Sequence, residues 1–231
     1  TVENIGSYDG DEVPQLYVVS PKSVYTKPRK MLKAFSRVFV QKNQSVCVDL
    51  SFRVSDLAFW CTDTDSYVVE KGDYLLQIGS SSEDIKCEVT VHVNGSVITG
   101  RDAQKMRSAI DVDDYRGVQF LTDRKDGMNY LEAKDFRSFA VYKGLEMKGF
   151  DAFEALISSP AGQTDIILAD NNSGEIIGTC NASGTGGMTF FTPVSCKVLP
   201  HNGLFDLRIC FTKHTSLKSF RFYYSGNRTT V

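Results

Sequence analysis

The sequence has no apolar run near the roughly 18 residues that a membrane-spanning helix needs. It also has no basic excess, with 26 Lys and Arg against 28 Asp and Glu, which disfavours a nucleic-acid-binding protein. No signal peptide opens the chain. Residues 1–4 look like the middle of a strand, so we interpret the chain as a fragment or a processed form. We expect neither a membrane nor a nucleic acid among its partners.

The residue patterns that mark common catalytic centres are also missing. Only three histidines occur, His92, His201 and His214, and their scattered positions are typical of surface side chains. No nucleophile elbow, phosphate loop or zinc-protease motif is present. Glycoside hydrolysis needs two carboxylates facing each other across a cleft, and no pair stands out in this sequence. We therefore expect no catalytic centre within the chain.

The six cysteines include no Cys-x-x-Cys pair, which disfavours zinc and thioredoxin-like sites. Three lie in each half, so at most one disulfide per half forms without a bridge between the halves, and the pairing stays open. Cys87 lies on the apolar phase of its strand, which predicts a buried free thiol.

Glycosylation sequons begin at five of the nine asparagines: Asn43, Asn94, Asn171, Asn181 and Asn227. Such sequons are used on the surface of secreted proteins. They favour a secreted protein, extracellular or periplasmic. The alternative is coincidence in a bacterial chain rich in Ser and Thr.

Apolar side chains recur with a period of two, the period of a β-strand. In residues 46–54 and again in 85–93, apolar and polar side chains alternate, which predicts two half-buried strands. Shorter strand candidates are 15–19, 37–40 and 74–78 in the first half, and 152–157, 165–168, 175–179, 190–194, 204–211 and 219–224 in the second. Gly-, Asn- and Pro-rich turn segments separate them.

Many short strands with turns between them predict β-sandwiches. We expect an all-β chain of two sandwich domains. The first domain is predicted at 1–93 and the second at 107–231. The polar stretch 94–106 between them is predicted to be a linker with at most one helical turn.

Two groups of side chains could bind ligands. Asp111 and Asp113 alternate at the start of the second domain, and carboxylate oxygens on one face of a strand can ligate Ca²⁺. Sugars stack on aromatic rings, which makes Tyr115, Tyr130 and Tyr142 candidates for carbohydrate binding. The alternative for each tyrosine is a ring packed at a sheet edge with its hydroxyl in water.

Ordered blocks of the first half, in 9–18, 27–35, 56–59, 68–74 and 79–85, resemble the fibronectin type III-like domain that ends family 3 glycoside hydrolases. Blocks of the second half, in 109–115, 126–131, 153–158, 185–191 and 216–222, resemble a family 6 carbohydrate-binding module, a jelly roll. The two resemblances imply an immunoglobulin- or fibronectin III-like sandwich followed by a jelly roll. The first also implies a domain that packs against catalytic domains and carries no catalytic residue.

The second resemblance implies a cleft in which a Tyr and a Trp sandwich a sugar beside an Asn. Tyr130 matches the Tyr, whereas Met188 stands in the place of the Trp and Ser216 in the place of the Asn. The loss of one stacking face and of the amide predicts a weak or relocated sugar site, or a structural spacer.

The same resemblance implies a structural Ca²⁺, held by acids of the opening strand and an Asp of the last strand. Asp111 and Asp113 match the first set, but Lys218 replaces the last-strand Asp. An ammonium cannot ligate a cation, and it could instead pair with those two carboxylates. We expect a weakened site and no other cofactor.

Together these expectations describe a non-catalytic accessory region of a secreted family 3 glycoside hydrolase, a β-xylosidase or β-glucosidase. Its partners would be the catalytic domains of that hydrolase and, weakly, a xylan- or glucan-type polysaccharide or oligosaccharide. The alternatives are a free-standing carbohydrate-binding or adhesion protein, and a self-contained hydrolase with an unrecognised carboxylate pair.

Overall fold

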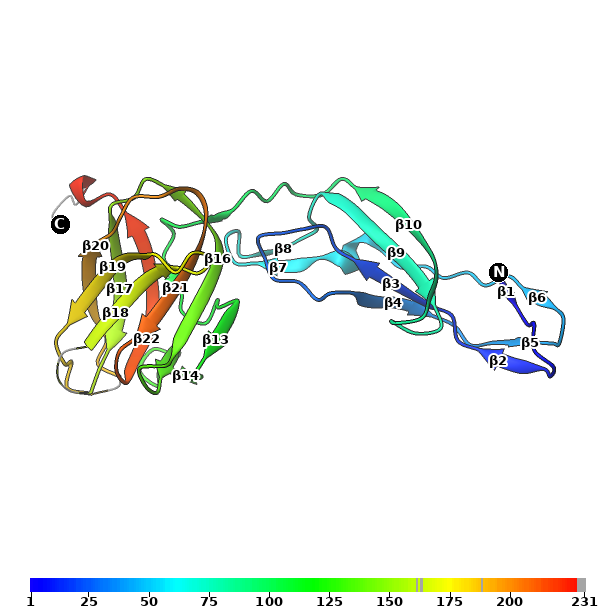
Figure 1. The fold of residues 1–231 in the computed structure, drawn as a ribbon, viewed down its shortest axis with the longest axis horizontal. Helices are drawn as coiled ribbons and strands as arrows, with labels where there is room; N and C mark the ends of the chain where they lie inside the picture. The colour runs from blue at the N-terminus through cyan, green and yellow to red at the C-terminus, as the bar shows by residue number, and fades with distance from the viewer. Residues whose placement is uncertain (161, 163, 188, 228–231) are drawn as a thin grey trace. The chain divides into compact units, whose positions relative to one another are not determined.

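In a computed structural model the chain folds into two compact units, unit 1 over residues 1–98 and unit 2 over residues 99–231 (Figure 1). The structure describes residues 1–160, 162, 164–187 and 189–227. Strands dominate both units, and the described helices are two short 3₁₀ turns, η1 (Val54–Leu57) and η2 (Ser225–Asn227). In the described residues no helix has the length and apolar character needed to cross a membrane. The predicted all-β fold class is confirmed.

Unit 1 is built on one antiparallel sheet of four strands in the order β10-β9-β3-β4. Their bounds are β3 (Gln15–Val19), β4 (Met31–Phe35), β9 (Gly72–Gly79) and β10 (Ile85–Val93). Three two-stranded ladders complete the unit: β1 (Val2–Glu3) with β6 (Ser45–Val46), β2 (Gly10–Glu12) with β5 (Val38–Val40), and β7 (Phe59–Cys61) with β8 (Ser66–Val68). The strand predicted at 15–19 is confirmed to the residue.

The prediction of a strand at 46–54 is wrong for most of its length. Only Ser45 and Val46 join a ladder, although residues 46–53 keep the predicted alternation of half-buried and exposed side chains. Alternating polarity sets which way the side chains of an extended chain point. A ladder also needs a partner strand, and the sequence of the segment itself does not contain that information.

The prediction of a buried Cys87 is wrong. Cys87 is exposed, and most of β10 is exposed on both of its faces. β10 is the edge strand of its sheet, and only its last residue, Val93, reaches the small core around Val18, Leu57 and Tyr74. A period of two shows which face a side chain shares, but not whether a second layer covers that face.

Unit 2 is a sandwich of two six-stranded sheets (Figure 1). One has the order β11-β16-β21-β18-β19, with β13 on β16, and the other the order β14-β15-β22-β17-β20, with β12 on β22. The bounds are β11 (Arg101–Asp102), β12 (Arg107–Ser108), β13 (Asp114–Arg116), β14 (Val118–Thr122), β15 (Asn129–Ala133), β16 (Phe139–Lys148), β17 (Ala152–Ser158), β18 (Thr164–Asp170), β19 (Ile176–Ala182), β20 (Thr192–Lys197), β21 (Asn202–Phe211) and β22 (Thr215–Tyr223). The long strand β16, second in the order of its sheet, was not predicted from the sequence.

The inner faces of the two sheets form one continuous apolar core. Phe153, Phe220 and Phe222 are fully buried in it, with their rings in mutual contact. A disulfide joins Cys180 of β19 to Cys196 of β20, so it links the two sheets across one end of the core. The sequence left the choice of cysteine partners open, and the structure pairs these two.

The segment predicted as a linker, 94–106, is divided by the structure. The two units meet at Ile98 and Thr99. Beyond that point β11 pairs in parallel with Leu145 and Glu146 of β16, and it therefore belongs to the second sandwich. The predicted helical turn is not formed, because residues 101 and 102 are extended and turns follow them.

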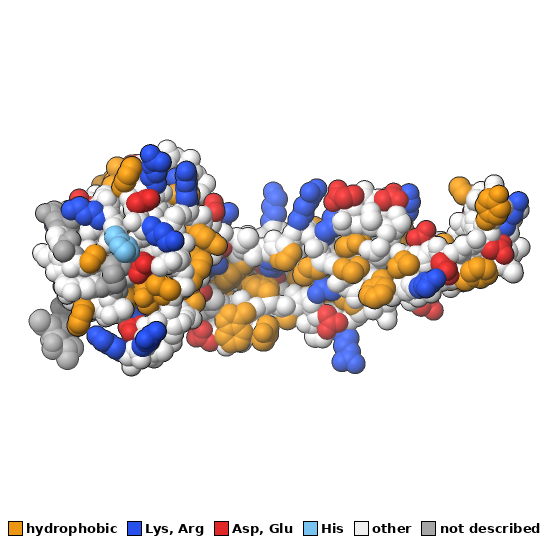
Figure 2. Space-filling view, turned by 90° about the horizontal axis from the view of Figure 1, so that it is seen from below, with side chains coloured by type: hydrophobic (Ala, Val, Ile, Leu, Met, Phe, Trp, Pro, Cys, Tyr) orange, Lys and Arg blue, Asp and Glu red, His pale blue; other side chains and the backbone are white. Residues whose placement is uncertain are grey.

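The surface of unit 1 carries many large apolar side chains (Figure 2). They are Ile5, Tyr8, Leu32, Phe35, Phe39, Val54, Trp60, Tyr67, Val89, Val91 and Val97. Soluble monomers rarely leave so much apolar surface uncovered, and such patches usually mark an interaction site.

Candidate functional site

Tyr130 lies on β15 with its side chain only 5% exposed. The edge of its ring meets the ring of Phe191, with the two centroids 5.3 Å apart. Burial also raises the pKa of its hydroxyl. Tyr130 would therefore offer a face to a sugar only if Phe191 moved away. Its role in binding stays a prediction, and the predicted partner Met188 lies outside the described residues.

Ser216 is the second residue of β22, opposite Glu132 of β15 on one side and Ser158 of β17 on the other. It is fully buried, and its hydroxyl has no hydrogen-bond partner among the described residues. Glu132 accepts a hydrogen bond from Gln119 at 2.8 Å and lies 3.3 Å from the Nε2 atom of His214. Ser216 thus sits in a polar strip across this sheet, and the structure does not place it against an exposed ring.

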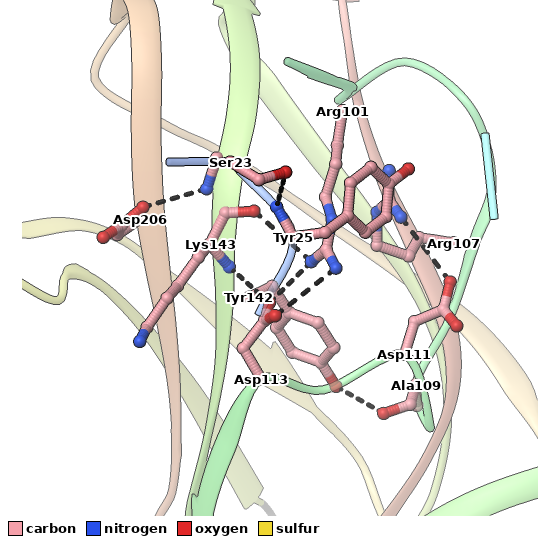
Figure 3. Close-up of polar contacts among 11 residues, drawn as sticks. Ser23, Tyr25, Arg101, Arg107, Ala109, Asp111, Asp113, Tyr142, Lys143 and Asp206 are labelled. Carbon is pink, nitrogen blue, oxygen red and sulfur yellow. Dashed lines mark hydrogen bonds and ion pairs between the residues drawn. The ribbon is translucent and has the colours of Figure 1, made fainter. Parts of the chain in front are cut away.

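The two other tyrosines have different environments. Tyr142 is fully buried on β16 and donates a hydrogen bond of 2.7 Å to the carbonyl of Ala109, so it is a core residue (Figure 3). Tyr115 on β13 is 50% exposed, and its ring meets that of Phe120 edge to face at 5.0 Å. Of the three candidate tyrosines, only Tyr115 presents an exposed ring.

Asp113 is buried, and its carboxylate is held from two sides (Figure 3). The Nη1 atom of Arg101 donates to its Oδ2 at 2.5 Å, and Nη2 donates to Oδ1 at 3.3 Å, which makes a bidentate pair. The backbone N–H of Lys143 donates to the same Oδ2 at 2.8 Å. The pair fastens β11 and the segment before β13 to β16.

Asp111 is engaged by a second arginine, with the Nη1 atom of Arg107 3.5 Å from its Oδ2 (Figure 3). Neither Asp111 nor Asp113 lies on a strand, so the predicted strand face of alternating carboxylates is not formed. In the described part of the chain, no three His, Cys, Asp or Glu side chains form a group that could hold a metal ion. The calcium expectation is not supported among these residues, since each of the two candidate carboxylates is paired with an arginine.

Lys218 does not pair with Asp111 or Asp113, which corrects that expectation. Its buried ammonium lies 2.8 Å from Oδ2 of Asp123 and 2.5 Å from Oδ2 of Asp126. It also lies over the ring of Phe191, 4.7 Å from the centroid. Lys218 therefore ties β22 to the turn that precedes β15 and to the residue that covers Tyr130.

This cluster shifts the pKa of all three groups. Hydrogen bonding to Lys218 lowers the pKa of Asp123 and of Asp126. Burial alone would lower the pKa of Lys218, but the hydrogen bonds and the charges of the two carboxylates raise it. All three groups are therefore charged over the whole neutral range, which is the state in which they hold the turn in place.

We expect the cluster to contribute to the acid sensitivity of unit 2. A carboxyl whose pKa is lowered by folding stabilises the fold above its unfolded pKa, near 4, and loses that contribution as the pH falls through the folded value. In Lys218→Met, the free energy of unfolding should fall less steeply between about pH 5 and pH 2 than in the wild type. Urea unfolding over that range measures the slope, and Lys213→Met, at an exposed lysine, is the matched control. An unchanged slope in Lys218→Met would contradict this assignment.

Sequence reasoning missed Asp123, Asp126 and Phe191. Asp126 stands in a segment that the resemblance singled out, but its link with Lys218 spans 92 residues. The available signal was a lysine in the middle of an apolar last strand, since a buried ammonium requires a carboxylate partner. That signal shows that Lys218 needs a carboxylate partner, but it does not identify the partner.

The family model for a fibronectin type III-like domain matches residues 12–82. The thermostable β-glucosidase B of Acetivibrio thermocellus is 36% identical over 96 residues, which are 42% of this chain. That match spans 13% of the length of the β-glucosidase.

Two solved structures resemble unit 2. A family 6 carbohydrate-binding module of Clostridium stercorarium, solved with cellobiose, superposes with a TM-score of 0.52 at 21% identity, and covers 55% of this chain and 98% of that one. A module of the same family from Clostridium cellulolyticum, solved with xylose, gives a TM-score of 0.50 at 24% identity, and covers 52% of this chain and 98% of that one. The chain therefore consists of a fibronectin type III-like domain followed by a jelly roll with the fold of family 6 carbohydrate-binding modules.

Proposed function

We propose that this chain is a non-catalytic accessory region of a secreted family 3 glycoside hydrolase, a β-glucosidase or β-xylosidase. Unit 1 would stabilise the catalytic domains of that hydrolase. Unit 2 would add a weak contact with a glucan- or xylan-type saccharide. The similarity of unit 1 to a β-glucosidase supports the assignment to a hydrolase.

The observation that carries the proposal is the imbalance of apolar surface in unit 1. Side chains as large as Phe35 and Tyr67 are mostly exposed, whereas its core cluster has only four buried members, Val18, Leu57, Tyr74 and Val93. The other buried apolar residues of the unit are Leu16, Tyr25, Val40 and Cys61. Each buried large apolar side chain contributes roughly 1.5–3 kcal/mol, so a core of this size gives little stability. Packing against a second protein surface would stabilise unit 1 and cover these side chains.

We propose that the carbohydrate contact of unit 2 is weak because few of its candidate aromatic rings are exposed. The related folds were solved with cellobiose and with xylose, and these sugars are therefore the first candidates. In unit 2, however, Tyr130 is covered by Phe191, and Tyr115 with Phe120 is the exposed aromatic pair that remains among the candidate tyrosines. One exposed aromatic face supports an affinity in the millimolar range.

Secretion is part of the proposal. The Cys180–Cys196 disulfide is of a kind that persists in oxidising compartments. The five sequons are also a feature of secreted chains. Either an extracellular or a periplasmic location fits both features.

Calorimetric titration tests the sugar contact. We expect dissociation constants in the millimolar range for cellobiose and xylobiose, and a further loss of binding in Tyr115→Ala. Tyr130→Ala is the comparison variant, and thermal unfolding checks that both variants fold. A micromolar site that disappears in Tyr130→Ala would overturn the weak-binding proposal and favour a free-standing carbohydrate-binding protein.

Thermal unfolding tests the role of unit 1. The chain alone should show no turnover of nitrophenyl β-glucoside or β-xyloside. Addition of the separately produced catalytic domains of the parent hydrolase should raise the unfolding midpoint of unit 1 and leave that of unit 2 unchanged. Turnover by the chain alone, or no shift on addition of those domains, would overturn the proposed function.

A further inference from the structure

The sheet of unit 2 that contains β15 has a polar face that points away from the core and is nevertheless buried. Tyr130 and Glu132 alternate along β15 with the core residues Leu131 and Ala133, so their side chains lie on the opposite face of the sheet. Tyr130 is 5% exposed and Glu132 is 9% exposed. Glutamate is rarely buried to this extent unless it is paired, and the outer face of an antiparallel sheet commonly contacts water. Another part of the chain therefore covers this face.

The neighbouring strand β22 extends the buried polar face. Ser216 pairs with Glu132 in the antiparallel ladder, which places the two side chains on the same side of the sheet. Ser216 is fully buried, and its hydroxyl has no hydrogen-bond partner among the described residues. A buried hydroxyl without a partner is costly, because it has given up its hydrogen bonds to water. The hydroxyl group of a ligand at this position would supply the missing partner.

The ring of Phe191 covers Tyr130 on this face. The two ring centroids are 5.3 Å apart, and rings in such contact leave no space for a sugar between them. The ammonium of Lys218 lies 4.7 Å from the centroid of Phe191, an attractive arrangement of a cation and a ring. Asp123 and Asp126 hold that ammonium at 2.8 Å and 2.5 Å. Phe191 is thus held over Tyr130 by a cation that is itself fixed.

The preceding residue, Phe190, has a different environment. Its side chain is 55% exposed, whereas Phe191 is half-buried. The Nζ atom of Lys125 lies 4.2 Å from the Phe190 centroid, so both phenylalanines have a lysine over the ring. The contact with Tyr130 is therefore what distinguishes Phe191, and Phe190 is a matched control for it.

We propose that Phe191 is an autoinhibitory residue that occupies the place of a saccharide on Tyr130. When Phe191 moves away, a sugar ring would stack on the ring of Tyr130. Glu132 and the hydroxyl of Ser216 would then bind the sugar hydroxyl groups. Because sugar binds only to molecules in which Phe191 is displaced, the observed affinity is lowered by the fraction that those molecules represent. The proposal rests on the sugar contact in the proposed function, and it adds the regulation of that contact.

The alternative role for Phe191 is that of a second stacking face for the sugar. The two roles predict opposite effects when the ring is removed. A residue that competes with the sugar weakens binding, so its removal strengthens binding. A stacking face contributes to binding, so its removal weakens binding.

Calorimetric titration of the whole chain with cellobiose and xylobiose tests the proposal. The dissociation constants of Phe191→Ala should be about tenfold lower than those of the wild type. The matched control, Phe190→Ala, should leave them unchanged. Addition of Tyr130→Ala to Phe191→Ala should remove the gain. Unchanged or weaker binding in Phe191→Ala, or a gain that persists without the Tyr130 ring, would overturn the autoinhibitory role.

Thermal unfolding shows whether each variant folds. Phe191→Leu is the second variant, because leucine keeps most of the apolar volume but has no ring to lie against Tyr130 and Lys218. Its affinity for both sugars should also rise, by about threefold. If Phe191→Ala does not fold, an unchanged or weaker affinity in Phe191→Leu overturns the proposal by itself.

Tyr115→Ala separates this result from the proposed function. If that variant weakens sugar binding by the wild type and Phe191→Ala changes nothing, the proposed function stands and the autoinhibitory role is removed. If Phe191→Ala gains affinity and Tyr115→Ala has no effect, the autoinhibitory role stands. The weak contact at Tyr115 is then removed from the proposed function.

Discussion

Replacement of Asp113 with alanine should lower the free energy of unfolding of unit 2 by about 3–5 kcal/mol. Asp113 and Arg101 are both buried, and the pair is bidentate. Removal of one partner leaves the other charge in a site with little water, and the loss of the carboxylate also leaves the N–H of Lys143 without its acceptor. Because the single tryptophan, Trp60, lies in unit 1, hydrogen exchange of unit 2 peptides at increasing urea, read by mass spectrometry, measures the change.

The neighbouring Asp114→Ala is the matched control. Asp114 is exposed on β13, and surface substitutions usually change stability by no more than about 0.5 kcal/mol. The same experiment tests the calcium hypothesis, because Ca²⁺ or a chelator should leave the wild-type midpoint unchanged. Stabilisation of the wild type by Ca²⁺, abolished in Asp113→Ala, would show that the carboxylate is a metal ligand.

Removal of the disulfide should have the second large effect, about 3 kcal/mol in Cys180→Ala combined with Cys196→Ala. The bond closes a loop of 16 residues and thereby restricts the unfolded chain. It also holds the edge strands β19 and β20 of two different sheets together. The loss should appear as a lower denaturation midpoint of unit 2, with unit 1 unaffected.

Cys210→Ala is the control for the disulfide, since Cys210 is a half-buried free thiol on β21. Its effect should be well below that of the double variant. Reduction of the wild type with dithiothreitol should reproduce the destabilisation of the double variant. A midpoint that is insensitive to reduction would show that the two cysteines act only through packing in the core.

The two large effects differ in how far the sequence predicted them. Cysteine arithmetic limited the second half to one disulfide among Cys180, Cys196 and Cys210, but the choice of partners depended on which strands come to lie at the same end of the sandwich. The sequence indicated Asp111 and Asp113 as candidate calcium ligands. Their partners Arg101 and Arg107 were not predicted, because Arg101 and Asp113 meet only where β11 and the segment before β13 both lie against β16.

The same distinction holds for the candidate sugar site. The resemblance placed Tyr130, Met188 and Ser216 around one cleft. The structure shows Tyr130 covered by Phe191 and Ser216 buried in the middle of a sheet. A residue type and its place along the chain predict what a ring could bind. Whether a loop from elsewhere in the sequence covers that ring is a property of the folded molecule.

By itself, the sequence determined the all-β fold class and the positions of strands such as β3, β9 and β17, because a period of two and the turn residues between strands are local signals. The tertiary structure alone decided which charges meet and which of the period-two faces are covered. β10 illustrates the difference. Its alternation is a local pattern of the sequence, but the exposure of Cys87, Val89 and Val91 depends on whether another layer lies over that face, and no local pattern encodes this.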